Sequence, residues 1–72
     1  MDKEELKGQI GRRIIKLRAV KGWSQSDLAR ASNKDRQAIE KLENGRVNPT
    51  IFSLYEIAKV LDVTLSELLK LK

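Results

Sequence analysis

Residues that stop helices recur at short intervals along the whole chain. Gly22, Asn33, Gly45 and Asp62 each end a segment whose apolar residues have helical spacing. Glycine and asparagine tolerate the left-handed backbone conformation that closes a helix, so the helices between them must be short. The pattern predicts an all-α, compact five-helix bundle without strands, with helices at about residues 4–21, 25–32, 36–44, 51–61 and 65–71.

Capping residues stand where these helices begin. Ser24 with Asp27 forms a variant of the capping box, and Thr64 with Glu67 forms a complete one. Asp35 is expected to cap the helix that follows it. These signals support the predicted starts of the second, third and fifth helices.

The first predicted helix has a clear apolar stripe. Leu6, Ile10, Ile14 and Leu17 follow one another at spacings of four, four and three residues, and Val20 falls close to the same line. This spacing places the side chains on one face of a helix. We expect that face to pack into the core.

The composition excludes most familiar chemistry. The 72 residues suffice for a single domain spanning residues 1–72, and they include no cysteine and no histidine. Disulfides, thiolate nucleophiles, ordinary zinc sites and imidazole bases are therefore excluded, and the carboxylates form no catalytic arrangement. We expect no enzymatic activity, no metal, no cofactor and no small-molecule effector.

The positive charge is concentrated in the first two thirds of the chain. Residues 1–22 carry seven Lys and Arg against three acids, residues 23–46 carry five against four, and residues 47–72 carry three against three. A basic surface suits a polyanion, either a nucleic acid or an anionic membrane. A membrane-surface helix would need an exposed apolar face, whereas the apolar stripe of the first helix is expected to pack into the core. With neither a signal segment nor a long apolar run, we expect a cytoplasmic protein that does not contact membranes.

The predicted helix 36–44 has an apolar and a polar face. At about 100° per residue, one side carries Ala38, Ile39 and Leu42, and the other carries polar residues: Gln37, Glu40, Lys41 and Asn44. The preceding short helix and the tight turn give the spacing of a helix-turn-helix, whose second helix enters the major groove of DNA. A polar outer face is also common on ordinary surface helices.

Glu40 is ambiguous within this face. Its carboxylate would repel phosphate, yet it can accept a hydrogen bond from the amino group of cytosine. It can equally pair with Arg36, four residues earlier on the same helix. We expect the pairing with Arg36.

Three motifs resemble a known family. GWSQSDLA, IEKLENG and NPTIFSLYEIAKVLDV occur in this order, and the similarity spans about residues 10–69. The chain thereby resembles the lambda-repressor-like, or Xre-type, helix-turn-helix domain found in small stand-alone regulators. The resemblance implies a transcriptional regulator, for example a repressor, that binds double-stranded DNA.

The resemblance also assigns residues to base reading. Arg36, Gln37 and Lys41 occupy the positions that contact base edges. Their chemistry agrees, because arginine pairs with guanine, glutamine pairs with adenine, and lysine bonds guanine or phosphate.

Other residues are candidates for phosphate contacts. By resemblance, Gln25 holds one phosphate, and Asn44 with the backbone near Gly45 holds another. Arg46 and Lys34 are basic residues that we expect to add further phosphate contacts.

The resemblance further pairs Arg18 with Glu43. Independently, Glu43 lies at the edge of the apolar face of its helix, where an unpaired carboxylate would be costly. The turn departs from the family because Ser32 and Lys34 replace residues that are usually apolar, so looser packing is expected there.

Surplus apolar residues near the C-terminus indicate a homodimer. The predicted interface combines residues of the last two helices: Ile51, Phe52, Tyr55, Leu65, Leu69 and Leu71. Exposed apolar patches commonly mark interfaces, and a dimer would bind an inverted-repeat operator. Two alternatives stay open: a monomer that pairs only on DNA, and an antitoxin-type module whose main partner is a toxin.

Overall fold

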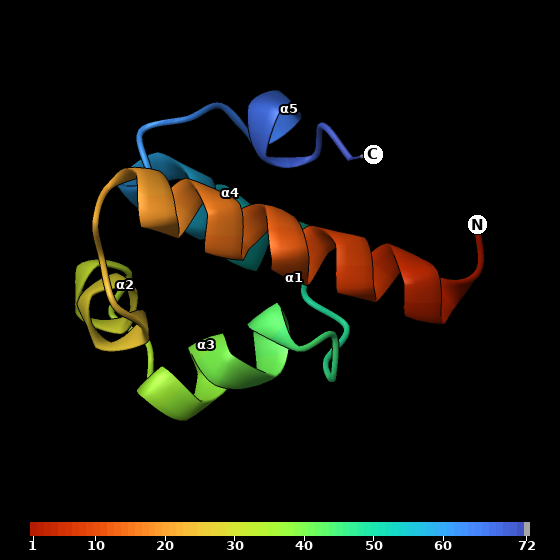
Figure 1. The fold of residues 1–72 in the computed structure, drawn as a ribbon, viewed down its shortest axis with the longest axis horizontal. Helices are drawn as coiled ribbons and strands as arrows, with labels where there is room; N and C mark the ends of the chain where they lie inside the picture. Colours follow the sequence, from red (N-terminus) through yellow and green to blue (C-terminus); the bar gives the residue numbers. More distant parts are fainter. Residues whose placement is uncertain (72) are drawn as a thin grey trace.

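Five helices joined by short connections make up the computed structural model, which describes residues 1–71 (Figure 1). They are α1 (Lys3–Val20), α2 (Gln25–Ala31), α3 (Arg36–Glu43), α4 (Ile51–Val60) and α5 (Leu65–Leu68). No strand occurs among these residues, and the predicted all-α fold is confirmed. Within the same residues, no helix combines the length and the apolar character that crossing a membrane requires.

The predicted stops coincide with left-handed backbone. Gly22, Asn33, Gly45 and Asp62 have φ values of 71°, 57°, 69° and 62°. Each reverses the chain directly after a helix, so short helices can fold back on one another. The Asp62 carboxylate also pairs with the Lys21 ammonium at 2.7 Å, and this contact ties the first of these turns to the last.

Both α2 and α5 begin with a capping box. Ser24 accepts from the Asp27 amide while its own N–H donates to the Asp27 carboxylate, and Thr64 and Glu67 repeat the arrangement. The hydrogen bonds from Ser24 lower the pKa of the Asp27 carboxyl. The expected cap by Asp35 is wrong, because its side chain accepts no capping hydrogen bond. Ala38, three residues later, also offers no side chain for the reciprocal bond of a capping box.

One large side chain from each helix is fully buried. These core residues are Ile14, Leu28, Ile39, Ile57 and Leu68. Leu6 and Val20 were expected beside them but are 41% and 79% exposed. With 18 residues, α1 is about 27 Å long at 1.5 Å per residue, whereas the eight residues of α3 span about 12 Å, so α3 can cover only part of α1.

The fifth helix ends at Leu68, earlier than predicted. A longer helix would need the Glu67 carbonyl to accept from the Leu71 N–H. That carbonyl instead accepts from the Lys70 N–H and from the Arg13 guanidinium, with Nε at 3.1 Å and Nη2 at 2.9 Å. The Leu71 N–H turns to the Leu69 carbonyl at 2.8 Å. Arg13 thus stops α5 and attaches it to α1.

Gly11 lets α1 approach the end of α3. A Cβ at this position would collide with the Glu43 carbonyl oxygen and would lie 2.8 Å from the Leu42 carbonyl oxygen. Both obstacles are backbone atoms, which cannot move aside as a flexible side chain does.

Gly11→Ala and Gly8→Ala should therefore have opposite effects on stability. We expect Gly11→Ala to cost about 1–3 kcal/mol, because α3 must move away from α1. A Cβ at Gly8 meets only the Arg12 guanidinium, with Nη1 at 3.3 Å, so Gly8→Ala should stabilise α1 by about 0.5–1 kcal/mol. Urea unfolding monitored by circular dichroism measures both, and equal effects would contradict the close contact.

Candidate nucleic-acid interface

The turn between α2 and α3 is held by internal hydrogen bonds. The Ser32 hydroxyl is buried and donates to the Leu28 carbonyl at 2.7 Å, while the Lys34 N–H donates to the Ala29 carbonyl at 2.8 Å. The polar Ser32 is therefore satisfied within the turn. Both bonds end on carbonyls of α2, so they hold the turn against the end of that helix.

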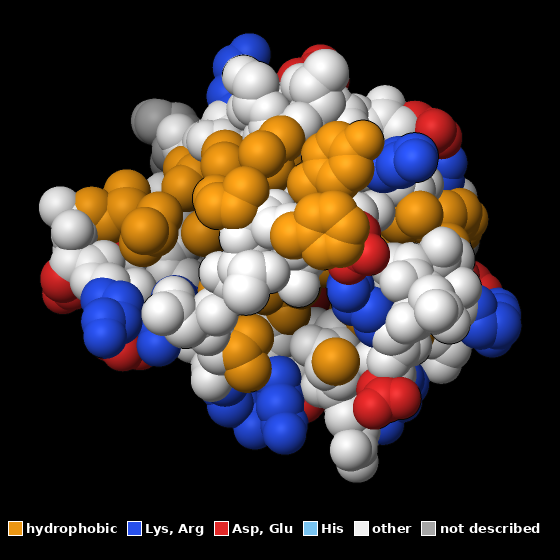
Figure 2. Space-filling view, turned by 180° about the vertical axis from the view of Figure 1, so that it is seen from behind, with side chains coloured by type: hydrophobic (Ala, Val, Ile, Leu, Met, Phe, Trp, Pro, Cys, Tyr) orange, Lys and Arg blue, Asp and Glu red, His pale blue; other side chains and the backbone are white. Residues whose placement is uncertain are grey.

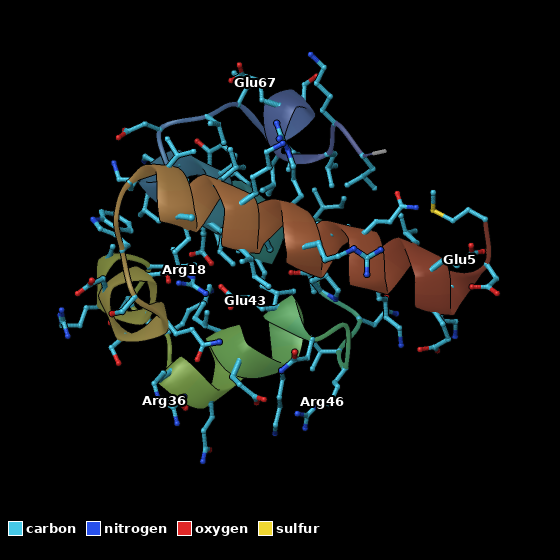
Figure 3. The ribbon with its side chains drawn as sticks, viewed as in Figure 1. Glu5, Arg18, Arg36, Glu43, Arg46 and Glu67 are labelled. Atoms are coloured by element: carbon cyan, nitrogen blue, oxygen red, sulfur yellow. The ribbon has the colours of Figure 1, made fainter. Side chains whose placement is uncertain are left out.

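The outward face of α3 is polar and exposed. Arg36, Gln37 and Lys41 are exposed, while Ile39 and Leu42 are buried. Figure 3 shows Arg36 projecting from the side of α3 that faces away from α1. Ala38 was expected on the inward side but is exposed as well. The three predicted base readers therefore share one accessible face.

A buried ion pair lies behind this face. Glu43 is only 3% exposed, and its carboxylate accepts from Arg18 through Nε at 2.7 Å and Nη2 at 2.9 Å (Figure 3). Arg18 also donates from Nη1 to the Trp23 carbonyl at 2.9 Å. The hydrogen bond to Glu43 raises the pKa of Arg18. The pair joins α1, α3 and the chain leading into α2.

Gln25 extends this pair to the exposed face. Its Nε2 donates to Glu43 Oε1 at 2.9 Å, and its Oε1 accepts from Arg36 Nη1 at 3.3 Å. A continuous hydrogen-bonded path therefore runs from Arg18 through Glu43 and Gln25 to Arg36. The predicted phosphate contact Gln25 lies beside a predicted base reader, with the orientation of its amide set by Glu43.

Asn44 and Arg46 meet Glu40 at the other end of α3. Glu40 Oε2 accepts from Asn44 Nδ2 at 2.7 Å and from Arg46 Nη2 at 2.8 Å. The expected pairing of Glu40 with Arg36 is wrong. Gln25, from another helix, reaches Arg36 first, and the loop after α3 brings Arg46 back to Glu40.

Lys34, the remaining predicted phosphate contact, is paired with α4. Its ammonium lies 2.8 Å from Glu56 Oε1, and its side chain is only 22% exposed. The structure thus brings Gln25, Asn44 and Arg46 to the two ends of α3, whereas Lys34 is held by a neighbouring helix.

The predicted interface residues separate into two groups. Ile51, Phe52 and Tyr55 are exposed, and the rings of Phe52 and Tyr55 stack with centroids 6.2 Å apart. The others, Leu65, Leu69 and Leu71, are partly buried against the core. Figure 2 views the molecule from behind Figure 1, and hydrophobic side chains gather on the face that it shows.

Comparisons with known proteins agree with this geometry. The model of a helix-turn-helix family matches residues 14–68. The chain belongs to the lambda-repressor-like helix-turn-helix family. It is 36% identical over 64 residues to the uncharacterised HTH-type transcriptional regulator y4dJ of Sinorhizobium fredii, a match that covers 89% of this chain and 83% of that protein.

Two solved members of the family share the fold. The restriction-modification controller protein C.AhdI from Aeromonas hydrophila has a TM-score of 0.82 and 34% identity, with 85% of this chain and 92% of that chain covered. SinR, a master regulator for biofilm formation solved in complex with DNA, has a TM-score of 0.78 and 37% identity, with 85% and 98% covered. The chain is thus a transcriptional regulator with a helix-turn-helix DNA-binding domain, and the family is not enzymatic.

Some contacts at the site had weak signals in the sequence or none. The spacing of Glu40 and Asn44 is that of neighbours on a helix, which could have indicated their hydrogen bond. Nothing local predicts that Gln25 reaches Arg36, since the two residues lie on different helices.

The cost of breaking the buried ion pair is testable. Arg18→Ala should destabilise the protein by about 3–5 kcal/mol, because it leaves the Glu43 carboxylate buried without its charged partner. Replacing both residues by methionine removes the charges together and should cost far less than Arg18→Ala. Urea unfolding without DNA measures both variants, and a double variant no more stable than Arg18→Ala would contradict this role.

Proposed function

We propose that this chain binds a specific sequence of double-stranded DNA through α3, and that two copies bind an inverted-repeat operator. The observation that carries the proposal is the exposed polar face of α3, on which Arg36, Gln37 and Lys41 are all accessible, with candidate phosphate contacts at both ends. The SinR structure supports the proposal, because a relative with this fold was solved in complex with DNA.

The three exposed side chains of α3 can distinguish base pairs. Arginine donates to both major-groove acceptors of guanine, and glutamine pairs with the acceptor and donor of adenine. Lys41 lies one turn beyond Gln37 on the same face, so it reaches the neighbouring base or phosphate. Together these groups read a short half-site.

The dimensions of α3 suit the major groove. An α-helix with its side chains is about 10–12 Å across, close to the groove width of about 12 Å, and the eight residues of α3 extend about 12 Å along the helix axis. Gln25 stands at one end, and Asn44 and Arg46 stand at the other. Contacts from both ends would hold phosphates on the two sides of the groove and fix the register of α3 against the bases.

A single half-site is too short for specific regulation. One recognition helix reads a few base pairs, whereas specific regulators bind with dissociation constants of about 10⁻⁸ to 10⁻¹¹ M. Two-fold pairing through Ile51, Phe52 and Tyr55 would supply the second helix, and the zero net charge of residues 47–72 does not oppose self-association. Half-sites about 10 to 10.5 base pairs apart, centre to centre, would fit such a dimer.

Base readers and phosphate contacts should respond differently to mutation. After selection of a preferred duplex from a random pool, Gln37→Ala should cost about 1–3 kcal/mol of binding free energy and relax the preference at one base pair. Arg46→Ala should weaken binding to all sequences and reduce the salt dependence by less than one full phosphate, because Glu40 shares the charge of Arg46 in the wild-type chain.

Lys16→Ala is the matched control for the loss of one positive charge. Lys16 is exposed and lies about 140° around α1 from Gly11, on the side away from α3, so its removal should have little effect. An unaltered consensus for Gln37→Ala would exclude it as a base reader. Equal losses for Lys16→Ala and Arg46→Ala would exclude a specific phosphate contact by Arg46.

The dimer surface can be tested in the same way. Phe52→Ser should raise the dimer dissociation constant at least about tenfold, because aromatic residues dominate small interfaces. Val20→Ser removes an apolar side chain that is more exposed than Phe52 from the end of α1 and should leave the dimer unchanged. Sedimentation velocity measures both, with thermal unfolding as a check on the fold.

A monomer at high micromolar concentration that binds one half-site as tightly as a full inverted repeat would contradict the dimer. The patch on α4 would then be available to a different protein, as in an antitoxin-type module.

A further inference from the structure

Glu40 holds the two phosphate contacts at the C-terminal end of α3. A single carboxylate oxygen, Oε2, accepts from the amide of Asn44 and the guanidinium of Arg46. The Glu40 side chain is 31% exposed and that of Arg46 is 60% exposed, so the cluster lies at the protein surface. Figure 3 shows Arg46 at the edge of the molecule where α3 lies.

The environment of this oxygen is the one a DNA phosphate oxygen would have. It is anionic, and it is bound by one neutral and one positively charged donor, the usual partners of phosphate in protein–DNA interfaces. Asn44 and Arg46 are the residues assigned to phosphate binding in the proposed function. The carboxylate therefore occupies donors that the proposed complex needs.

We propose that Glu40 is a positioning residue that takes the place of a phosphate oxygen in the DNA-free protein and competes with DNA for Asn44 and Arg46. This inference rests on the proposed function. Glu40 weakens binding in two ways: its contacts must be broken or shared when a phosphate arrives, and its own charge repels that phosphate. Both penalties are independent of base sequence.

The competition is limited by the geometry of Arg46. A guanidinium has five N–H donors, and the contact with Glu40 uses Nη2. Arg46 can thus hold the carboxylate and a phosphate together, with its charge divided between them. The expected effect of Glu40 is therefore moderate.

Glu40→Gln tests the competition because it removes the charge and keeps the shape. Binding of the full chain to the selected duplex and to a scrambled duplex should tighten about three- to tenfold at 0.1 M salt, the effect of removing one partly screened like charge beside a phosphate. The slope of log affinity against log salt should steepen by up to about 0.9, since Arg46 then neutralises a phosphate fully. Glu40→Ala should act in the same direction.

Asp62→Asn is the matched control. It also removes one negative charge and releases one basic partner, Lys21, and asparagine accepts the left-handed backbone at this position. In Figure 1 the connection between α4 and α5 lies across the molecule from α3. The control should alter neither affinity nor salt slope, while circular dichroism melts verify that all variants fold.

The following outcomes would contradict the competition between Glu40 and DNA. An unchanged affinity for Glu40→Gln, or an equal gain for Asp62→Asn, overturns the proposal. Weaker binding to the selected duplex with a lost preference at one C·G pair also overturns it and makes Glu40 a cytosine reader. If the wild-type chain bound no duplex at low salt, the proposed function itself would fall, a result distinct from a failure of Glu40 alone.

Discussion

The buried carboxylate of Glu43 is the constraint on which the rest of this structure depends. A charge in the interior requires a charged partner and hydrogen bonds to its oxygens, and Arg18 and Gln25 supply them. The contact is possible because Gly11 lets α1 approach the last turn of α3. The position of α3, the orientation of Gln25 and the placement of Arg36 all follow from this pair. The core and the proposed DNA-facing surface are therefore parts of one network.

The two ends of α3, the proposed DNA-binding helix, are held in different ways. At the start, the neutral amide of Gln25 orients Arg36 without reducing its charge. At the end, the negative charge of Glu40 partly neutralises Arg46. Under the proposed function, the first arrangement favours a specific contact with a base, and the second restrains a contact that carries no sequence information. Binding would then depend more on base reading than the number of basic residues indicates.

The sequence predicted the fold better than the contacts of the site. The left-handed stops at Gly22 and Asn33 are local and were found, because the conformation depends on the residue itself. Local rules failed at Glu40, which they pair with Arg36 on the same helix. Local rules also missed the early end of α5. The donor that competes for the Glu67 carbonyl is Arg13, which lies 54 residues from Glu67 in the sequence. Contacts between helices depend on the tertiary arrangement, which composition and periodicity do not contain.

We propose that α3 and its two ends form the surface that meets DNA, and a titration of the isotope-labelled chain with its selected duplex tests this most directly. Amide chemical-shift changes measured by NMR should be largest between residues 24 and 46, and the side-chain amides of Gln25, Gln37 and Asn44 should shift. Amides on the outer side of α1, such as that of Lys16, should change little. Large changes on that side of α1 with small changes along α3 would contradict the central claim.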